Sequence, residues 1–211
     1  MVITYYGGQF VKIQQGETVI AVNPFSKASK KKNIRFGANL ALVSLKHPDY
    51  NGVENLSFGD KAPFVISGPG EYEVDGITVS GFASSKRVGA EERINTIYAL
   101  NIEGVRVCIL GAQPTVEIGS EVIEGIGQVD IMFVPIAGGD VLSPADAEKI
   151  AVTFDAKLVV PVAIEGADDK NLKVFLKEAG AESAPVEEKL TIKKKDLEGR
   201  DGDVVVLIPQ S

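Results

Sequence analysis

The chain has 211 residues, of which 45% are hydrophobic and 24% charged, and its formal net charge at pH 7 is −7. This length fits one large domain or two small ones, with enough apolar residues for a core of normal size. The acidic balance argues against non-specific nucleic-acid binding, which depends on neutralising phosphates. The single cysteine, Cys108, excludes an internal disulfide, and its place in an apolar run predicts a packed, inert thiol.

The sequence contains no apolar run near the ~18 residues that a membrane span needs. Its first residues, 1–5, lack the basic region and long apolar stretch of a signal peptide. We therefore expect a cytoplasmic protein with no membrane partner.

The first half of the sequence predicts short strands separated by turns that contain glycine. The predicted strands are 2–6, 10–14, 18–22, 39–44, 64–67, 71–74, 77–82, 95–102 and 105–110. Residues 39–44 are almost wholly apolar, which is typical of a buried strand.

The second half alternates strands with helices. Strands are predicted at 129–135, 157–162, 188–192 and 203–208, and helices at about 143–154 and 169–179. Ser143 can cap the first helix, Pro144 suits its first position, and Gly180 ends the second. This order predicts an α/β or α+β protein in which two sheets pack together with helices outside.

The segment Ser44-Leu45-Lys46-His47-Pro48-Asp49-Tyr50-Asn51-Gly52 follows the buried strand. It resembles the metallo-β-lactamase superfamily signature, Thr-His-x-His-x-Asp-His-x-Gly. His47, Asp49 and Gly52 match that signature, and His47 is the only histidine of the chain.

Further segments are similar to a subgroup of small zinc-dependent hydrolases that includes ascorbate-6-phosphate lactonase-like proteins. They lie at 5–8, 22–25, 68–74, 95–98, 111–113, 134–139 and 160–163. The resemblance extends over most of the chain. It implies one domain over residues 1–211 with a four-layer αββα sandwich of the metallo-β-lactamase type.

The sequence departs from the family pattern at most positions that carry metal ligands. Leu45 and Tyr50 stand in histidine positions, Ala112 replaces the bridging aspartate, and Ala163 replaces the last histidine. A further expected histidine falls near Ser84 or Ser85. Two neighbouring acids of the family are amides here, at Asn23 and Asn39.

A catalytic zinc site needs about three protein ligands and an open position for water. One imidazole and one carboxylate, of His47 and Asp49, do not form such a site. Without a metal, water keeps a pKa of about 15.7 instead of about 7, so the usual hydroxide nucleophile is lost. The resemblance therefore implies a degenerate member with no metal cofactor and without its relatives' hydrolase activity.

Other roles stay open for the remaining polar residues. His47 is either a base or ligand of an unusual site, or a polar loop residue held by Asp49, and the second interpretation is favoured. Tyr50 is either an acid or stacking group, or a packed residue. Serine catalysis at Ser84 or Ser85 is disfavoured, since no Gly-x-Ser-x-Gly elbow is present and only His47 could act as base.

Two basic runs, at 27–35 and 193–195, are either an RNA-facing patch, since some members of the superfamily are nucleases, or solvated faces. Solvated faces are favoured, because aromatic residues are sparse in the runs and the chain is acidic. The expected function is binding of a small ligand in the vestigial cleft, or protein interaction. The alternative is a hydrolase with a site remodelled around His47, Asp49 and Tyr50, or completed by a partner subunit. A homo-oligomer, or a pair with an intact paralogue, is a further expectation.

Overall fold

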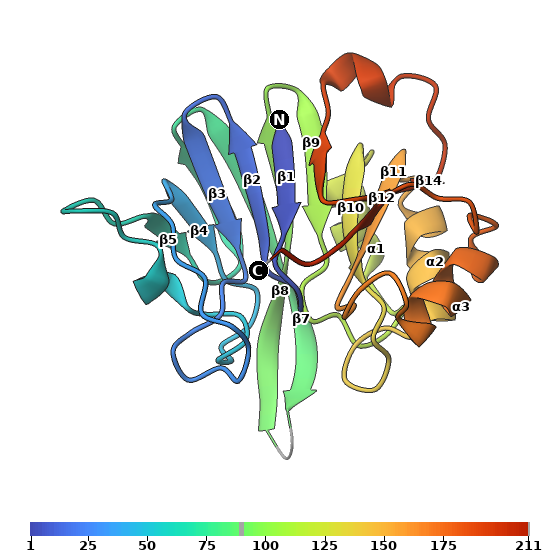
Figure 1. The fold of residues 1–211 in the computed structure, drawn as a ribbon, viewed down its shortest axis with the longest axis horizontal. Coiled ribbons are helices and arrows are strands. Elements are labelled where there is room, and N and C mark those ends of the chain that lie inside the picture. Colours follow the sequence, from blue (N-terminus) through green and yellow to red (C-terminus); the bar gives the residue numbers. More distant parts are fainter. Residues whose placement is uncertain (89–90, 211) are drawn as a thin grey trace.

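The computed structural model describes residues 1–88 and 91–210. Two mixed sheets face each other (Figure 1). The first has the order β13 (Lys189–Thr191), β1 (Val2–Tyr5), β2 (Val11–Gln15), β3 (Thr18–Val22), β4 (Leu40–Leu42) and β5 (Phe64–Ile66). The second has the order β14 (Asp203–Val204), β11 (Leu158–Val162), β10 (Ile131–Pro135), β9 (Val105–Ile109), β8 (Glu91–Ile102), β7 (Ile77–Val88) and β6 (Gly70–Val74). A short parallel pair, β12 (Val186–Glu187) with β15 (Val206–Leu207), lies near the C-terminus.

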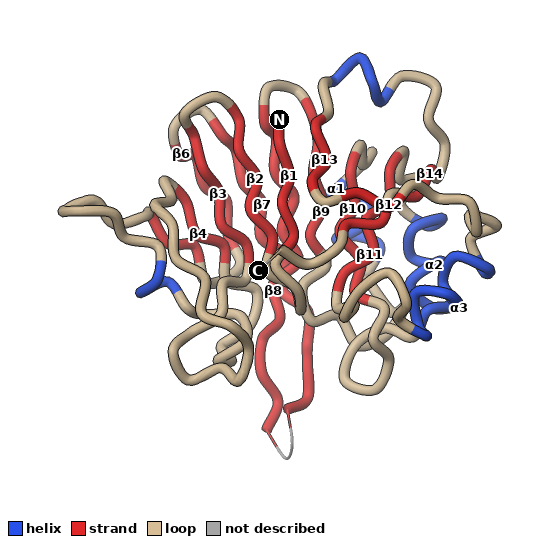
Figure 2. Tube along the Cα trace, in the orientation of Figure 1, coloured by secondary structure: helices blue, strands red, loops and turns tan. Residues whose placement is uncertain are grey.

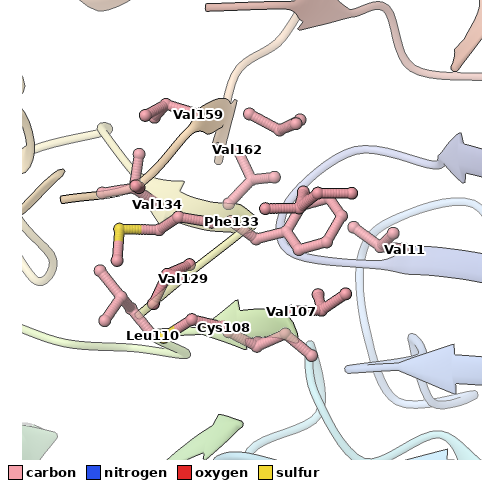
Figure 3. Packing of buried hydrophobic residues seen from close by; sticks show 14 of the residues in the cluster. Val11, Val107, Cys108, Leu110, Val129, Phe133, Val134, Val159 and Val162 are labelled. Atoms are coloured by element: carbon pink, nitrogen blue, oxygen red, sulfur yellow. The ribbon is translucent and has the colours of Figure 1, made fainter. Parts of the chain in front are cut away.

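The core lies between the two sheets. Ile3, Ile13, Ile20 and Leu42 of the first sheet belong to one apolar cluster with residues of β8, β9, β10 and β11. Figure 3 shows Phe133 of β10 directed toward Val11 of β2, and both side chains are buried. Cys108 belongs to this cluster and is fully buried, as the sequence predicts. Burial raises the pKa of its thiol to about 12.

The α-helices among the described residues are α1 (Ser120–Ile126), α2 (Pro144–Thr153) and α3 (Lys170–Glu178), and Figure 2 shows them beside the second sheet. The Ser143 hydroxyl accepts from the Asp146 amide at 3.2 Å, and the Asp169 carboxylate caps α3. Both predicted helices are thus confirmed, to within a residue or two at each end. Helix α1 was not among the elements predicted from the sequence.

The outer face of the first sheet is covered by loops and one short 3₁₀-helix, Val53–Asn55. Strand alternation directs Ala21 and Ala41 to this face, while their neighbours in β3 and β4 face the core. Phe10 and Phe25 pack over the two alanines, with ring centroids 5.3 Å apart. This aromatic layer takes the place of helices on that side of the sandwich.

Strands β7 and β8 form a hairpin much longer than the sequence predicts. They pair from Thr78↔Asn101 to Val88↔Glu91, whereas the expected strands were 77–82 and 95–102. The far end of the hairpin projects from the body of the molecule (Figure 1). In residues 1–88 and 91–210, no helix has the length and apolar character needed to cross a membrane.

Candidate functional site

The loop at 44–52 leaves the C-terminal end of β4 and is held to the second sheet. The Thr96 amide donates to the Ser44 carbonyl at 2.8 Å, and Leu45 forms an isolated antiparallel bridge with Asn95 of β8. The motif recognised in the sequence therefore lies where the two sheets come together at one edge of the sandwich.

The glycine that closes the motif is required by packing. The Gly52 amide donates to the Pro24 carbonyl at 2.8 Å. A Cβ at Gly52 would overlap the backbone of Phe25. The role of Gly52 in holding the loop therefore does not depend on a bound metal.

An apolar cluster contains three of the residues that the resemblance assigns to metal-ligand positions. Leu45 is 2% exposed and Ala112 is 0% exposed, and both pack with Val141, against which Tyr50 also lies. We call Leu45, Ala112, Val141 and Tyr50 the replacement cluster. Sequence comparison identified three of its members but not Val141, which carries no signal beyond its hydrophobicity.

A buried polar network lies next to this cluster. The Asn23 side-chain oxygen accepts from the Ser44 amide at 2.9 Å and from the Ser44 hydroxyl at 2.6 Å. The Asn95 side-chain oxygen accepts from the Ala112 amide at 2.7 Å, and its nitrogen donates to the Leu110 carbonyl at 3.0 Å. These bonds fix the backbone on which Leu45 and Ala112 are presented.

Asn23 is fully buried, with φ at +50°, a conformation that asparagine tolerates better than most residues. Its side-chain nitrogen has no hydrogen-bond partner among the described residues. A carboxylate here would place a full charge out of contact with water, which is costly without a counter-ion. The amide keeps the acceptor for Ser44 without that charge, in agreement with the interpretation of the sequence.

The same interpretation is wrong for Asn39. This residue is exposed at the start of β4, and its side-chain oxygen accepts from the Val19 amide at 2.9 Å. Ser44 follows at the other end of the strand, roughly 16 Å away for five extended residues. Asn39 therefore joins two strands and takes no part in the cleft.

A cleft of about 280 Å³ opens beside the replacement cluster. Ala163, which the resemblance assigns to the last histidine position, lines it together with Tyr50 and Asp49. The Ala163 amide donates to the Gly8 carbonyl at 2.5 Å, and the Tyr5 hydroxyl accepts from the Ile164 amide at 3.1 Å. These contacts join the two sheets beneath the cleft. We call it the vestigial cleft.

The retained carboxylate and Tyr50 are held by neighbours in the cleft wall. Asp49 accepts a hydrogen bond from the Ser29 hydroxyl at 2.5 Å. The Tyr50 hydroxyl accepts from the Gln9 side-chain nitrogen at 3.1 Å. Burial, and then the nearby carboxylates of Asp49 and Asp140, raise the pKa of Tyr50. Tyr50 is therefore protonated at physiological pH and can offer a hydroxyl to a ligand.

His47 does not pair with the carboxylate of Asp49. Its Nδ1 accepts from the Asp49 backbone amide at 3.2 Å, and its ring lies edge-on to Tyr50 with centroids 6.0 Å apart. His47 lines a different pocket from the one lined by Asp49 and Tyr50. The loop thus directs His47 to one pocket and Asp49 and Tyr50 to the other.

The remaining sequence candidates lie away from a catalytic arrangement. The Ser84 hydroxyl accepts from the Asn95 side-chain nitrogen at 2.9 Å, and the side chain of Ser85 lies outside the described part of the structure. The basic residues of the two runs are exposed, as expected. Among them Lys31 extends to the vestigial cleft, with its ammonium 6.0 Å from the Phe25 ring centroid.

The side chains at this edge do not fit a metal ion. In the described ranges, 1–88 and 91–210, no group of three or more His, Cys, Asp or Glu side chains is placed to hold one. His47 and Asp49 face different pockets, and Leu45, Ala112, Ala163 and Tyr50, which the resemblance assigns to ligand positions, carry apolar groups or a phenol. The geometry suits non-covalent binding through hydrogen bonds and charges.

A family model described as "Beta-lactamase superfamily domain" matches residues 2–163. The chain belongs to this superfamily. The match and the two facing sheets confirm the metallo-β-lactamase-like sandwich that the sequence motifs predicted. No match was found among curated protein sequences.

Solved structures of the superfamily resemble the chain over its whole length. A protein of Thermotoga maritima, provisionally described as a zinc-dependent hydrolase, is 24% identical with a TM-score of 0.80, covering 99% of both chains. A metallo hydrolase of Ignicoccus hospitalis is 15% identical with a TM-score of 0.65, covering 100% of this chain and 96% of the other. The isothiocyanate hydrolase of Delia radicum gut bacteria is 10% identical with a TM-score of 0.63, covering 100% and 98%. At these identities the likeness establishes the fold.

Proposed function

We propose that this protein is a metal-free, degenerate member of the superfamily that binds a small molecule in the vestigial cleft and lacks hydrolase activity. The observation that carries the proposal is the replacement cluster. Leu45 and Ala112, which the resemblance assigns to metal-ligand positions, pack against Val141 and Tyr50. Because these side chains pack together and exclude water, no open position for a metal-bound water remains among them.

The lining of the vestigial cleft favours a small polar ligand. Carboxylates of Asp49, Asp140 and Glu165 line it with the single ammonium of Lys31. The volume of about 280 Å³ is below the range of ~300–1,000 Å³ usual for drug-sized ligands. A compact molecule with an amino group or several hydroxyls would donate hydrogen bonds to such carboxylates, and the Tyr50 hydroxyl could bind an oxygen of the same molecule.

Metal analysis tests the first half of the proposal. We expect protein purified without chelator to contain far less than one zinc, manganese or iron per chain. Added zinc and added chelator should both leave the melting temperature unchanged, because ligand binding raises stability only where a site exists. A stoichiometric metal that is lost in His47→Ala would overturn the proposal.

A thermal-shift screen of small amines, amino sugars and polyols tests the second half. Hits should lose their effect in Glu165→Gln, a substitution in the exposed part of the cleft lining. Glu178→Gln on α3 is the matched control, since this exposed glutamate is not part of that lining. Hits that act equally on both variants would show that they bind elsewhere.

A remodelled hydrolase is the second candidate, because solved relatives are described as hydrolases and Tyr50 and Asp49 share the cleft wall. Ester, lactone and phosphodiester substrates should be tested with Tyr50→Phe and His47→Ala. Activity that copurifies with the chain and falls in either variant would favour this candidate. Cytoplasmic location, a homo-oligomer and pairing with an intact paralogue stay predictions, and sedimentation of the native extract tests the last two.

A further inference from the structure

A second pocket lies across the motif loop from the vestigial cleft, beside Arg93 and Ile94, at the base of the part of the β7–β8 hairpin that extends beyond the Leu45–Asn95 bridge. It measures about 650 Å³ and shares no lining residue with the cleft. His47, Pro48 and Asn51 of the motif loop line this second pocket. Asp49 and Tyr50, which lie between them in the sequence, line the vestigial cleft. We call it the hairpin-base pocket.

Positive groups outnumber negative ones around this pocket, although the chain as a whole carries a net charge of −7. Lys46 and Arg93 line it together with one carboxylate, that of Glu91. Glu91 and Arg93 form an ion pair at 3.0 Å, with Glu91 72% exposed. An exposed pair of this kind contributes little stability, so an incoming anion can replace Glu91 at the guanidinium.

The guanidinium of Arg93 is fixed by the fold. Its Nη1 donates to the Lys46 carbonyl at 2.5 Å, so the head group is tied to the motif loop while its stem belongs to β8. The side chain is 32% exposed, which leaves it accessible to a ligand. A guanidinium held in this way offers further N–H donors in a planar arrangement that matches a carboxylate or a phosphate.

His47 supplies a second oriented donor. Because Nδ1 accepts from the Asp49 amide, the neutral ring carries its proton on Nε2. The ring lines the hairpin-base pocket and is held by the edge-on contact with Tyr50. A hydrogen-bond donor with a fixed direction at a pocket wall is typical of a binding site.

One wall of the pocket is apolar. Ile94, at 63% exposure, lines it with Pro48 and Pro69. A large exposed aliphatic side chain beside fixed cationic groups suits a ligand that has both an anionic group and an apolar body.

We propose that the hairpin-base pocket binds a small organic anion, with its carboxylate or phosphate group between Arg93, Lys46 and His47 and its apolar part against Ile94. This inference goes beyond the proposed function, because it concerns another pocket and holds whether or not the vestigial cleft is occupied.

The single histidine makes the test direct, because the Cε1–H resonance of His47 gives one signal in the full-length protein. Phenyl phosphate, benzoate and inorganic phosphate should be titrated at fixed pH, with benzylamine as the cationic control. We expect a saturable shift of the His47 signal with phenyl phosphate or benzoate, and no shift with benzylamine. Which of the two anions binds more tightly identifies the preferred group.

Substitutions separate the contributions of charge and of the apolar wall. Arg93→Gln should weaken phenyl phosphate binding by about tenfold or more, a factor typical of losing a charged hydrogen bond. Lys46→Gln, at an exposed position, should weaken it more moderately without disturbing the fold. Ile94→Ser should weaken the binding of phenyl phosphate but leave the binding of inorganic phosphate unchanged. Lys177→Gln, at an exposed position on α3, is the matched control and should have no effect.

Several results would overturn the proposal. One is a shift that rises linearly without saturation for every anion. Another is equal binding by the unmodified chain, Lys46→Gln and Arg93→Gln. Because Arg93 also holds the loop, its variant is interpreted only with an unchanged melting temperature, and Lys46→Gln decides the outcome if Arg93→Gln fails to fold.

Discussion

The replacement cluster predicts that Leu45 contributes to stability as an ordinary core residue does. Leu45 is 2% exposed and packs against Ala112 and Val141. Leu45→Ala removes three carbon atoms at ~0.8 kcal/mol each, and an unfilled cavity adds to this loss. We expect the free energy of unfolding to fall by about 3 kcal/mol. For a chain of this size that corresponds to a melting temperature about 6–12 °C lower.

Urea unfolding followed by circular dichroism measures this change, provided that the slope of the transition stays constant between variants. Val152→Ala on α2 is the control, because Val152 is 68% exposed. It should change the free energy of unfolding by less than ~0.5 kcal/mol. A similarly small effect of Leu45→Ala would refute the packing argument.

Leu45→His distinguishes packing from a latent metal site. It restores the first histidine of the signature, but it places an imidazole among Ala112, Val141 and Tyr50. We expect a loss of stability comparable to that of Leu45→Ala, with no recovery on adding zinc. A real site would add about 2.7 kcal/mol when zinc is present at ~100 times its dissociation constant. A rise of that size would contradict the metal-free proposal.

Three further predictions concern the surroundings of the site. Gly111→Ala should be strongly destabilising in urea unfolding, because the φ of Gly111 is +62° and a Cβ would lie 2.5 Å from the Asn95 side-chain oxygen. Gly138→Ala is the control, since Gly138 has a φ of +72° and open space around it, and it should lower the free energy of unfolding by only about 1 kcal/mol. Tyr50→Phe should lower the free energy of unfolding by about 1 kcal/mol through loss of the Gln9 hydrogen bond, and an unchanged value would mean that this bond adds nothing. Cys108 should resist a thiol reagent at neutral pH in the folded protein, because it is buried and burial raises its pKa to about 12. It should react once per chain in urea, and fast labelling without denaturant would contradict this prediction.

Strands and helices with regular patterns were predictable from the sequence. The helix at 144–153 has a capping serine and a proline at its first position, and both signals hold in the structure. Helix α1 has neither a capping side chain nor a proline at its first position. It is also only seven residues long and contains Gly125, so its pattern is weak. The extension of β8 was missed because residues 91–93 are charged and show no alternation with apolar residues. Pairing with β7 determines their conformation.

The candidate site was predictable only in part. Resemblance to the family assigned Leu45, Tyr50, Ala112 and Ala163 to metal-ligand positions, and in the structure the first three belong to one cluster while Ala163 lines the cleft beside it. It could not show that Val141 completes the packing, because a valine after Gly139 and Asp140 has no motif around it. It also grouped His47 with Asp49, although the loop directs them to different pockets. Adjacency in a loop does not determine the direction in which each side chain points.

The burial of Leu45 and Ala112 bears on whether single substitutions could create the metal site that the proposal denies. Leu45→His or Ala112→Asp alone would each bury a polar group without a partner, at about 1–3 kcal/mol. Together they would remove about 2–6 kcal/mol from a total stability of ~5–15 kcal/mol. Metal binding could offset this loss only after the ligands at Tyr50 and Ala163 were also restored. We therefore expect the double variant Leu45→His/Ala112→Asp to be less stable than either single variant, with or without zinc. Stabilisation of that variant by zinc would refute the argument.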